Sequence, residues 1–251
     1  TFQISTKARL DPNSSESIVS QIDRKIDASL GRLQRNFVEL YQLHNRIQNI
    51  SDKNNFSVKD ILKKGGVADA MEKFKSDGRI KSIGITALGD IDAINKVVLS
   101  DYFDVAQIYY NLLNPSASFS SPGKWNDHNF SNLIKNCKSK DMGLMNIRIY
   151  AAGYLATDKR HGREIPITFG IDETELNKRV EKINLIMRDI QGTKAQKALR
   201  YGLSNDDMST IVIGLAEISH LEEALEGYEL GSLDEEILRK IEELQMNNFI
   251  N

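Results

Sequence analysis

Cysteine is nearly absent from this sequence, and long apolar runs are missing. The single cysteine, Cys137, cannot form a disulfide within the chain, which indicates a reducing compartment. No apolar stretch reaches the roughly 18 residues that a membrane span needs, and no signal-peptide pattern opens the chain. The sequence therefore predicts a cytoplasmic protein that makes no contact with a membrane.

Neither sign of charge is in excess. The chain has 33 basic and 35 acidic residues, and its formal net charge is -2. Proteins that bind nucleic acid or an anionic membrane surface usually carry a basic patch, so both partners are excluded as the main ligand. The apolar share of 40% and the length of 251 residues fit one large globular domain over residues 1–251.

Short apolar runs alternate with amphipathic segments along the whole chain. The runs predict six strands, at residues 2–5, 37–43, 80–85, 103–108, 144–149 and 210–213. The first helix is expected to begin after Ser14 or Ser15, and the second to end at Asp77-Gly78. Further helices are expected at residues 90–99, 129–140, 173–189, 193–201, 219–228 and 234–244. Alternating strands and helices predict an α/β protein with a parallel sheet.

The pattern favours a barrel over a dinucleotide-binding sheet. No GxGxxG follows the first strand, so a Rossmann-type fold lacks its main support. A (β/α)8 TIM barrel closes with eight strands, and six are visible here. The chain also opens at Thr1 in what looks like a strand already under way. We therefore expect a (β/α)8 barrel whose first two βα units are missing from the sequence as given.

Several common catalytic patterns are absent from the sequence. The four histidines show no HxH or HExxH spacing and the lone cysteine offers no thiolate pair, so no metal site is predicted. A GxSxG nucleophile elbow and a Walker-type phosphate loop are also absent. These absences argue against a serine hydrolase, a metalloenzyme and a P-loop nucleotide-binding protein.

Polar residues follow the predicted strands at their carboxyl ends, where barrel enzymes build their active sites. They are Lys7, His44, Thr86, Gln107, Asn111, Arg148 and Gly214. An ammonium group can lower the pKa of a neighbouring phenol, and an imidazole can donate a hydrogen bond to a developing oxyanion. Gln107 can bind an amide edge through its donor and its acceptor. Taken singly, Lys7 could be a solvated cation and His44 a strand cap.

Two long irregular segments follow the second and fourth predicted strands. They are "ISDKNNFSVKDILKKGG" at 50–66 and "NLLNPSASFSSPGKWND" at 111–127. Loops after barrel strands lie on the carboxyl face, so both could border a pocket or simply be tolerated surface loops. Trp125, the only tryptophan, could wall a substrate pocket or anchor its own loop.

Five segments resemble the aldo-keto reductase superfamily in the same order along the chain. They are "ISTK" at 4–7, "SLGRLQRNFVELYQLHN" at 29–45, "DGRIKSIGIT" at 77–86, "FDVAQIYYNLLNP" at 103–115 and "STIVIGLAEISHLEEAL" at 209–225. "GGVADAMEKFKSDGRIKSIGITALGD" and "IRIYAAGYL" look most like the branch of aldose and sugar dehydrogenases. The resemblance implies a (β/α)8 barrel that binds NAD(P)H without a Rossmann domain. It also implies hydride transfer between the nicotinamide and an aldehyde, ketone or aldose.

The resemblance assigns roles to several strand-end residues. In the family a tyrosine is the general acid, assisted by a lysine, a histidine and an aspartate; Lys7 matches the lysine and His44 the histidine. Thr86 and Gln107 match residues that hold the nicotinamide carboxamide. The family's serine–asparagine pair is Thr86-Ala87 here, which leaves one amide contact without its usual residue.

The same resemblance places further cofactor contacts in the second half of the chain. Arg148, Tyr150 and the backbone from Ala151 to Gly153 match the region that touches the nicotinamide ring and the pyrophosphate. Gly214 to Glu223 matches the adenosine-side loop and the helix after it, whose N-terminus suits a phosphate. No lysine or arginine in this segment would pair with a 2′-phosphate, and the Glu217 carboxylate would repel one. Between NAD and NADP, the sequence favours NAD.

The family's tyrosine and aspartate lie in the first two βα units, which this sequence does not show. Without its general acid the chain as printed is not expected to catalyse the reaction. Two hypotheses follow. The protein is an oxidoreductase acting on a small carbonyl compound or sugar, seen without those units, or it is a noncatalytic nucleotide-binding or regulatory barrel.

Overall fold

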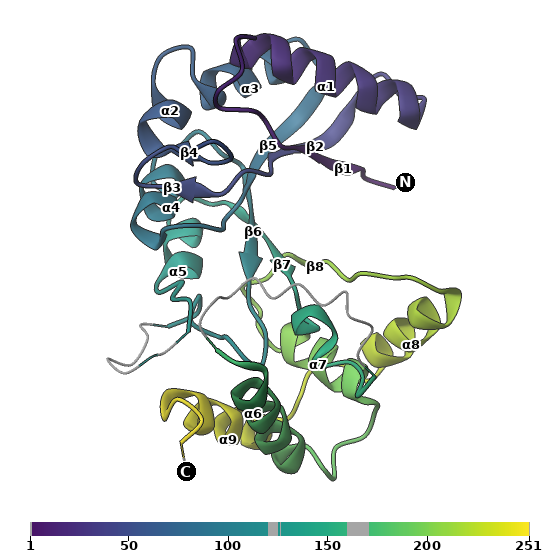
Figure 1. The fold of residues 1–251 in the computed structure, drawn as a ribbon. Coiled ribbons are helices and arrows are strands. Elements are labelled where there is room, and N and C mark those ends of the chain that lie inside the picture. The colour runs from purple at the N-terminus through teal and green to yellow at the C-terminus, as the bar shows by residue number, and fades with distance from the viewer. Residues whose placement is uncertain (1, 120–124, 126, 160–170, 251) are drawn as a thin grey trace. The chain divides into compact units, whose positions relative to one another are not determined.

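The computed structural model describes residues 2–119, 125, 127–159 and 171–250 (Figure 1). The chain divides into two compact units. Unit 1 comprises Thr1–Ile108 and Lys135–Leu144, and unit 2 comprises Tyr109–Ile134 and Met145–Asn251. Part of the segment 111–127, at residues 120–124 and 126, lies outside the described residues.

The main sheet has six strands in the part of the chain that is described, and their order follows the sequence. The strands are β1 (Ser5–Ala8), β2 (Val38–Leu43), β5 (Ile80–Thr86), β6 (Val105–Tyr109), β7 (Gly143–Ile147) and β8 (Thr210–Ile211). The pairs β1–β2, β2–β5, β5–β6 and β7–β8 are parallel. Sequential parallel order with intervening helices is the winding of a (β/α)8 barrel, so the predicted fold class is confirmed as a partial barrel.

The core of unit 1 lies between the sheet and two helices. α1 (Ile18–Leu33) and α3 (Val67–Ser76) pack together and against β1 and β5 (Figure 1). α3 turns Val67, Met71 and Phe74 inward at the three- and four-residue spacing of a helix face, each at most 1% exposed. Burial of one such side chain contributes about 1.5–3 kcal/mol, so α3 holds its side of the sheet firmly. Two further helices complete this half of the chain, α4 (Ile91–Val98) and α5 (Leu133–Lys138).

The predicted position of the first strand is wrong. The strand runs from Ser5 to Ala8 instead of residues 2–5, because only from Ser5 onward does the backbone pair with β2. Phe2, which suggested the earlier start, is 93% exposed. Lys7 therefore lies inside β1 and does not follow a strand exit.

The predicted start of the first helix is also wrong. α1 begins after Ser17 and not after Ser14 or Ser15, since the Ser17 hydroxyl accepts a hydrogen bond from the amide of Ser20 at 3.1 Å. The predicted end of the second helix is confirmed, because α3 ends with Asp77 as its C-terminal cap.

The insertion at residues 50–66 is partly ordered, which the sequence did not predict. β3 (Ile47–Gln48) and β4 (Phe56–Ser57) form a separate parallel pair, and the short helix α2 (Val58–Leu62) follows directly. Ile61 of α2 is fully buried. The insertion therefore has an apolar anchor of its own and is not a loose loop.

Unit 2 is mainly helical. It contains the 3-10 turn η1 (Ala151–Gly153), α6 (Glu173–Ile186), α7 (Lys194–Leu203), α8 (Ile218–Glu229) and α9 (Glu235–Met246). α7 begins with a capping box, in which Thr193 and Gln196 exchange side-chain to backbone hydrogen bonds. α8 approaches α7 at Gly227, where an added Cβ would lie 3.0 Å from the Gln196 Cγ. The four predicted helices of this region are confirmed.

Candidate functional site

The register of the sheet puts four predicted site residues of unit 1 on one face. Paired residues of a parallel sheet share a face, and so do alternate residues along a strand. Lys7 pairs with Gln42, which precedes His44 by two positions. Thr86 pairs with Gln107, and the β2–β5 register continued by one residue sets His44 opposite Thr86. We call these four residues on four adjacent strands (Lys7, His44, Thr86 and Gln107) the polar row.

A glycine lies next to the polar row, where no space is left for a side chain. Gly84 lies one level below Thr86 on the same face, paired with Gln42 and Val105. A Cβ at Gly84 would be 2.8 Å from the Val105 carbonyl oxygen and 3.1 Å from the Gln42 Cγ. Gln42 itself donates to the Ser5 hydroxyl at 2.8 Å, which ties β1 to β2 on this face. No side chain at position 84 could fit without moving the backbone.

His44 is half-buried at the end of β2 and is electrically neutral at pH 7. Burial, and after it the positive charges of Lys7 and Arg9, lower its pKa to about 4. Both cations therefore act electrostatically on the imidazole. A neutral imidazole can donate one N–H hydrogen bond and accept another, which suits the polarisation of a carbonyl oxygen.

Thr86 and Gln107 are both buried and bonded to each other. The Thr86 hydroxyl donates to Oε1 of Gln107 at 3.2 Å, and the two side chains are 3% and 4% exposed. The bond fixes the plane of the Gln107 amide. A fixed amide beside a hydroxyl is a suitable donor set for a carboxamide, as the resemblance predicted.

Asn45, which sequence reasoning missed, holds the chain beyond β1 against the chain beyond β2. Its Oδ1 accepts from the amide of Leu10 at 2.8 Å, and its Nδ2 donates to the carbonyls of Leu10 and Asn54 at 2.8 and 2.7 Å. The side chain is 1% exposed. The backbone bond from the His44 amide to the Ala8 carbonyl at 2.9 Å lies just before it. Together these bonds keep the ends of the two strands side by side.

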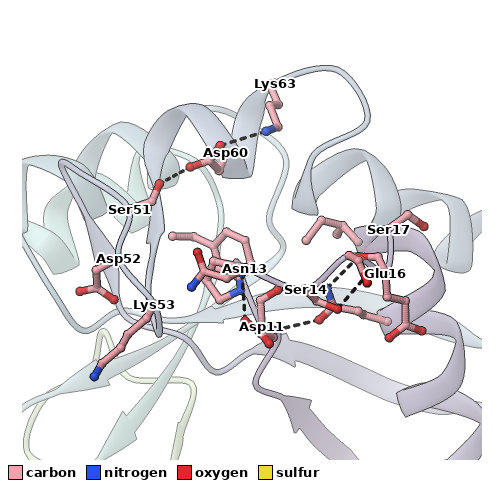
Figure 2. A pocket seen from close by; sticks show the side chains of 15 residues that line it. Asp11, Asn13, Ser14, Glu16, Ser17, Ser51, Asp52, Lys53, Asp60 and Lys63 are labelled. Carbon is pink, nitrogen blue, oxygen red and sulfur yellow. Dashed lines mark hydrogen bonds and ion pairs between the residues drawn. The ribbon is translucent and has the colours of Figure 1, made fainter.

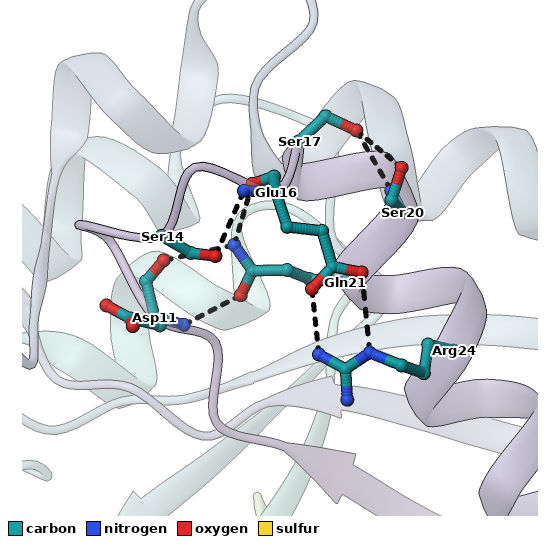
Figure 3. A network of polar contacts seen from close by, with 7 residues as sticks. All are labelled: Asp11, Ser14, Glu16, Ser17, Ser20, Gln21 and Arg24. Atoms are coloured by element: carbon teal, nitrogen blue, oxygen red, sulfur yellow. Dashed lines mark hydrogen bonds and ion pairs between the residues drawn. The ribbon is translucent and has the colours of Figure 1, made fainter.

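A second amide fixes the loop between β1 and α1 (Figure 3). Gln21, which is 2% exposed, accepts from the Asp11 amide at 2.8 Å and donates to the carbonyls of Asp11 and Glu16 at 3.0 and 3.2 Å. The Glu16 carboxylate pairs with Arg24 at 2.8 Å, an exposed contact that adds little stability. Two buried side-chain amides thus hold this part of the chain, Asn45 at Leu10 and Gln21 at Asp11.

A polar pocket of about 490 Å³ borders the same loop (Figure 2). It is lined by the loop after β1, by residues 51–53 and by α2 with its flanks. Hydrogen bonds from Ser51 and Ser57 and the ammonium of Lys63 lower the pKa of Asp60 on its wall to about 2. Several lining residues bond to one another, as Asp60 does to Ser51 and Lys63, and the lining does not include the residues of the polar row. The pocket and the polar row are therefore separate features.

In unit 2, the backbone after β7 adopts a left-handed conformation at several positions. Arg148, Ala151, Ala152 and Gly153 have φ values of 63, 46, 58 and 101°. This conformation costs a residue with a Cβ about 1–2 kcal/mol, and such strain concentrates at functional sites. The Nδ2 of Asn111 donates to the Arg148 carbonyl at 3.0 Å and supports the turn. The turn contains the residues predicted to touch the nicotinamide and the pyrophosphate.

Tyr150 lies in this turn and close to Glu223 of α8. Burial, and then the charge of Glu223, raise the pKa of the Tyr150 phenol. The Glu223 carboxylate also accepts from the Thr193 hydroxyl at 2.6 Å, so it links α8 to the start of α7. The charge of Glu223 thus acts on Tyr150, and Thr193 is a hydrogen-bond partner of Glu223.

Gly214 and Glu217 lie in the exposed stretch between β8 and α8. Glu217 is the N-cap residue of α8, and within the described residues its side chain makes no capping hydrogen bond. A Cβ at Gly214 would meet no described atom within 4 Å. The open start of a twelve-residue helix offers backbone N–H groups to an anion.

Trp125 makes a contact within its own loop. Its indole Nε1 donates to the His128 carbonyl at 3.4 Å, and the side chain is half-buried. Of the two roles expected from the sequence, this bond supports loop anchoring.

Two kinds of site are absent from the residues that the structure describes. There is no group of three or more His, Cys, Asp or Glu side chains that could hold a metal ion. In that same part of the chain, every helix is too short or too polar to cross a membrane.

A parallel barrel sheet with a lysine, a histidine and two amide-binding residues on one face defines an α/β-barrel protein with a candidate site on its strands. The family comparison agrees with this class. The model of the Aldo/keto reductase family matches residues 1–246, so the chain belongs to that family.

The individual relatives have low sequence identity to this chain. The chain is 26% identical over 226 residues to an L-galactose dehydrogenase of Arabidopsis thaliana, and the match covers 88% of this chain and 63% of the relative. The structure is similar to the holo form of the aldo-keto reductase AKR11C1 from Bacillus halodurans, with a TM-score of 0.71, 18% identity and coverage of 96% of this chain and 72% of that one. The apo form gives a TM-score of 0.67 and 18% identity over 96% and 70% of the two chains. The chain thus spans less than two thirds of the length of this curated relative.

Proposed function

We propose that this protein is an NAD(P)-dependent oxidoreductase that transfers a hydride between a nicotinamide and a small carbonyl compound. The observation that carries the proposal is the polar row, which sets Lys7 and His44 beside Thr86 and Gln107 on one face of adjacent parallel strands. Family membership supports the reaction class. The L-galactose dehydrogenase relative supports an aldose as the substrate. A cytoplasmic location is part of the proposal and rests on composition.

For an aldose in its hemiacetal form, oxidation breaks the C1–H bond and the hydroxyl O–H bond. The nicotinamide supplies or accepts the hydride when it is bound. The hydroxyl proton leaves through a general base to water, and the sugar becomes a lactone. Charge develops on the oxygen at C1 as this happens, so the oxygen needs hydrogen-bond donors.

The neutral imidazole of His44 would hold that oxygen by donating its N–H. The Lys7 ammonium would stabilise the developing negative charge and lower the pKa of a neighbouring phenol or acid. Both groups lie on the same face of the sheet, and the electrostatic effect of Lys7 on His44 supports their acting together. The polar row thus supplies the groups that would orient the substrate oxygen and stabilise its charge.

The residues present also fit a nicotinamide cofactor. The bonded Thr86–Gln107 pair offers donors and acceptors to the carboxamide. In unit 2, the start of α8 offers backbone N–H groups to a phosphate, and Glu217 offers a carboxylate to ribose hydroxyls. α8 contains no lysine or arginine for a 2′-phosphate, which supports NAD over NADP.

The polar row contains no tyrosine that could act as the general acid. We propose that two further βα units would complete the barrel and supply the family's tyrosine and aspartate, in keeping with the 63% of the curated relative that this chain spans. The competing function is a noncatalytic barrel that binds the nucleotide without turning it over.

Two measurements distinguish these functions. NADH and NADPH fluorescence reports cofactor binding, and nicotinamide absorbance reports turnover with L-galactose, other aldoses and small aldehydes. In the full-length protein we expect cofactor binding and aldose oxidation, and a His44→Ala loss in kcat/KM of about 10²-fold or more. A matched Lys64→Met variant, on the exposed surface beside α2, should behave as wild type. Binding without turnover for every substrate would establish the noncatalytic function, and failure to bind either cofactor would reject both.

A further inference from the structure

Arg9 lies beside the polar row and is not one of its four residues. It follows Lys7 by two positions, so the alternation of an extended chain puts both side chains on the same face. The backbone on either side of Arg9 stays alongside β2, through the His44 amide to Ala8 carbonyl bond at 2.9 Å and the two bonds of Asn45 to Leu10 at 2.8 Å. The position of Arg9 is therefore fixed by its neighbours.

The guanidinium of Arg9 is exposed and has no carboxylate partner among the residues that the structure describes. Three other arginines of unit 1 have carboxylate partners, whereas Arg32 on α1 bonds only to the Ser29 hydroxyl within the described residues. Arg24 pairs with Glu16 at 2.8 Å, Arg35 with Glu39 at 2.7 Å, and Arg79 with three aspartates at 2.7 to 2.9 Å. An arginine held in place and left without an anion is ready to bind one.

The chemistry around Arg9 favours an anion at this end of the site. Lys7 and Arg9 are both positive and the neighbouring His44 is neutral at pH 7, so an anionic group would meet attraction there. A guanidinium offers two parallel N–H donors that match a carboxylate or a phosphate, and binding through both fixes orientation. Lys7 and Arg9 lie two residues apart along an extended chain, roughly 7 Å, so one small molecule can reach both.

We propose that Arg9 is a specificity residue that binds an anionic substituent of the substrate, so that the site prefers sugar acids or sugar phosphates over neutral aldoses. This inference rests on the proposed function, because it deepens the substrate class of the same site. In a substrate such as a uronic acid, the carbonyl or hemiacetal end would meet Lys7 and His44 while the carboxylate meets Arg9.

Binding to the protein as it exists tests the inference without requiring turnover. D-glucose, D-glucuronate and D-glucose 6-phosphate differ only at carbon 6, so they isolate the anion and separate carboxylate from phosphate. The imidazole NMR signal of His44, assigned with a His44→Asn variant, reports binding beside Arg9. We expect at least one of the two anions to bind about 10-fold or more tightly than glucose, because a charge-assisted hydrogen bond is lost with the neutral sugar.

Three variants assign the effect. Arg9→Gln should remove the preference for the anion, and Arg9→Lys should keep part of it, since charge remains while the paired donors are lost. Arg32→Gln, an exposed arginine on α1, should match wild type. Equal binding of all three sugars to wild type would overturn the inference, and so would a preference that survives in Arg9→Gln.

The inference and the proposed function can fail separately. Nicotinamide-linked oxidation of neutral aldoses, with no difference for the anions, would keep the function and reject the role of Arg9. An Arg9-dependent preference in binding, with no oxidation of any sugar, would support the role of Arg9 and reject the oxidoreductase function. If Arg9→Gln weakened NADH binding and left the sugar preference unchanged, Arg9 would bind the cofactor and the inference would be wrong.

Discussion

Acid should destabilise this protein through His44. Burial, with the charges of Lys7 and Arg9, lowers the pKa of the folded-state imidazole from 6.5 to about 4. Between these two pH values the unfolded chain binds a proton at this side chain and the folded chain does not. The contribution of His44 to stability is therefore fully present above pH 6.5 and is lost as the pH falls towards 4.

The size of the effect follows from the shift. A change from 6.5 to about 4 is about 2.5 pKa units, and each unit corresponds to about 1.36 kcal/mol, which gives about 3 kcal/mol in all. His44 is only half-buried, so solvent screening reduces this value. We expect a loss of about 1–2 kcal/mol in the free energy of unfolding between pH 7 and pH 4.

Urea unfolding at a series of pH values measures this loss. Wild type should lose stability more steeply than His44→Asn, and the difference between the two should grow by about 1–2 kcal/mol across the window. His220→Asn, on the exposed surface of α8, should follow wild type. If wild type and His44→Asn lost stability in parallel, or if the NMR titration of His44 had its midpoint near 6.5, the proposed desolvation of the imidazole would be wrong.

Three further predictions concern the site and its support. Gly84→Ala should destabilise unit 1 by about 1–3 kcal/mol in urea unfolding, because its Cβ would overlap the Val105 carbonyl. Gly31→Ala adds a Cβ to α1 that meets no described atom within 4 Å, so it should stabilise the protein by about 0.5–1 kcal/mol. If Gly84→Ala and Gly31→Ala changed the free energy of unfolding in the same direction, the packing argument would be refuted. Asn45→Ala should cost about 1–3 kcal/mol and speed amide exchange at Leu10, whereas unchanged exchange would show that Asn45 does not hold the strand ends. In the full-length protein, Lys7→Met should lower kcat of the oxidation about 10²-fold and change the pH–rate profile, and an unaltered profile would remove Lys7 from the acid–base step.

The parallel sheet could be predicted from the sequence because each buried strand is a short apolar run. β2 and β5 were located to within a residue for this reason. β1 was not, since Phe2 and Ile4 alternate like a strand while the pairing with β2 begins at Ser5. Strand pairing depends on the neighbour, and one strand alone does not reveal its register.

The ordered part of the insertion escaped prediction for a different reason. α2 has five residues, too few for a helical repeat to show, and β4 has two. Their stability comes from Ile61, which is buried by the rest of unit 1. Elements this short are fixed by tertiary packing and not by local propensity.

The candidate site also has residues that could be predicted from the sequence and one that could not. Lys7, His44 and Thr86 could be selected by residue type and family resemblance, because they stand at or near strand ends. Gln107 was also expected at a strand end, but it is the middle residue of β6. Arg9 could not be selected, since its place on the face of Lys7 depends on β1 continuing beside β2 past Ala8.

The neutral state of His44 limits what the polar row can do. An imidazole whose pKa is about 4 is not an effective proton donor at pH 7, although its N–H still donates a hydrogen bond. The proton exchanged with the sugar oxygen must therefore pass through another group, and the neighbouring ammonium of Lys7 would ease that group's deprotonation. The two candidate functions thus differ by one acid–base side chain placed beside Lys7, and the polar row would orient a carbonyl in both.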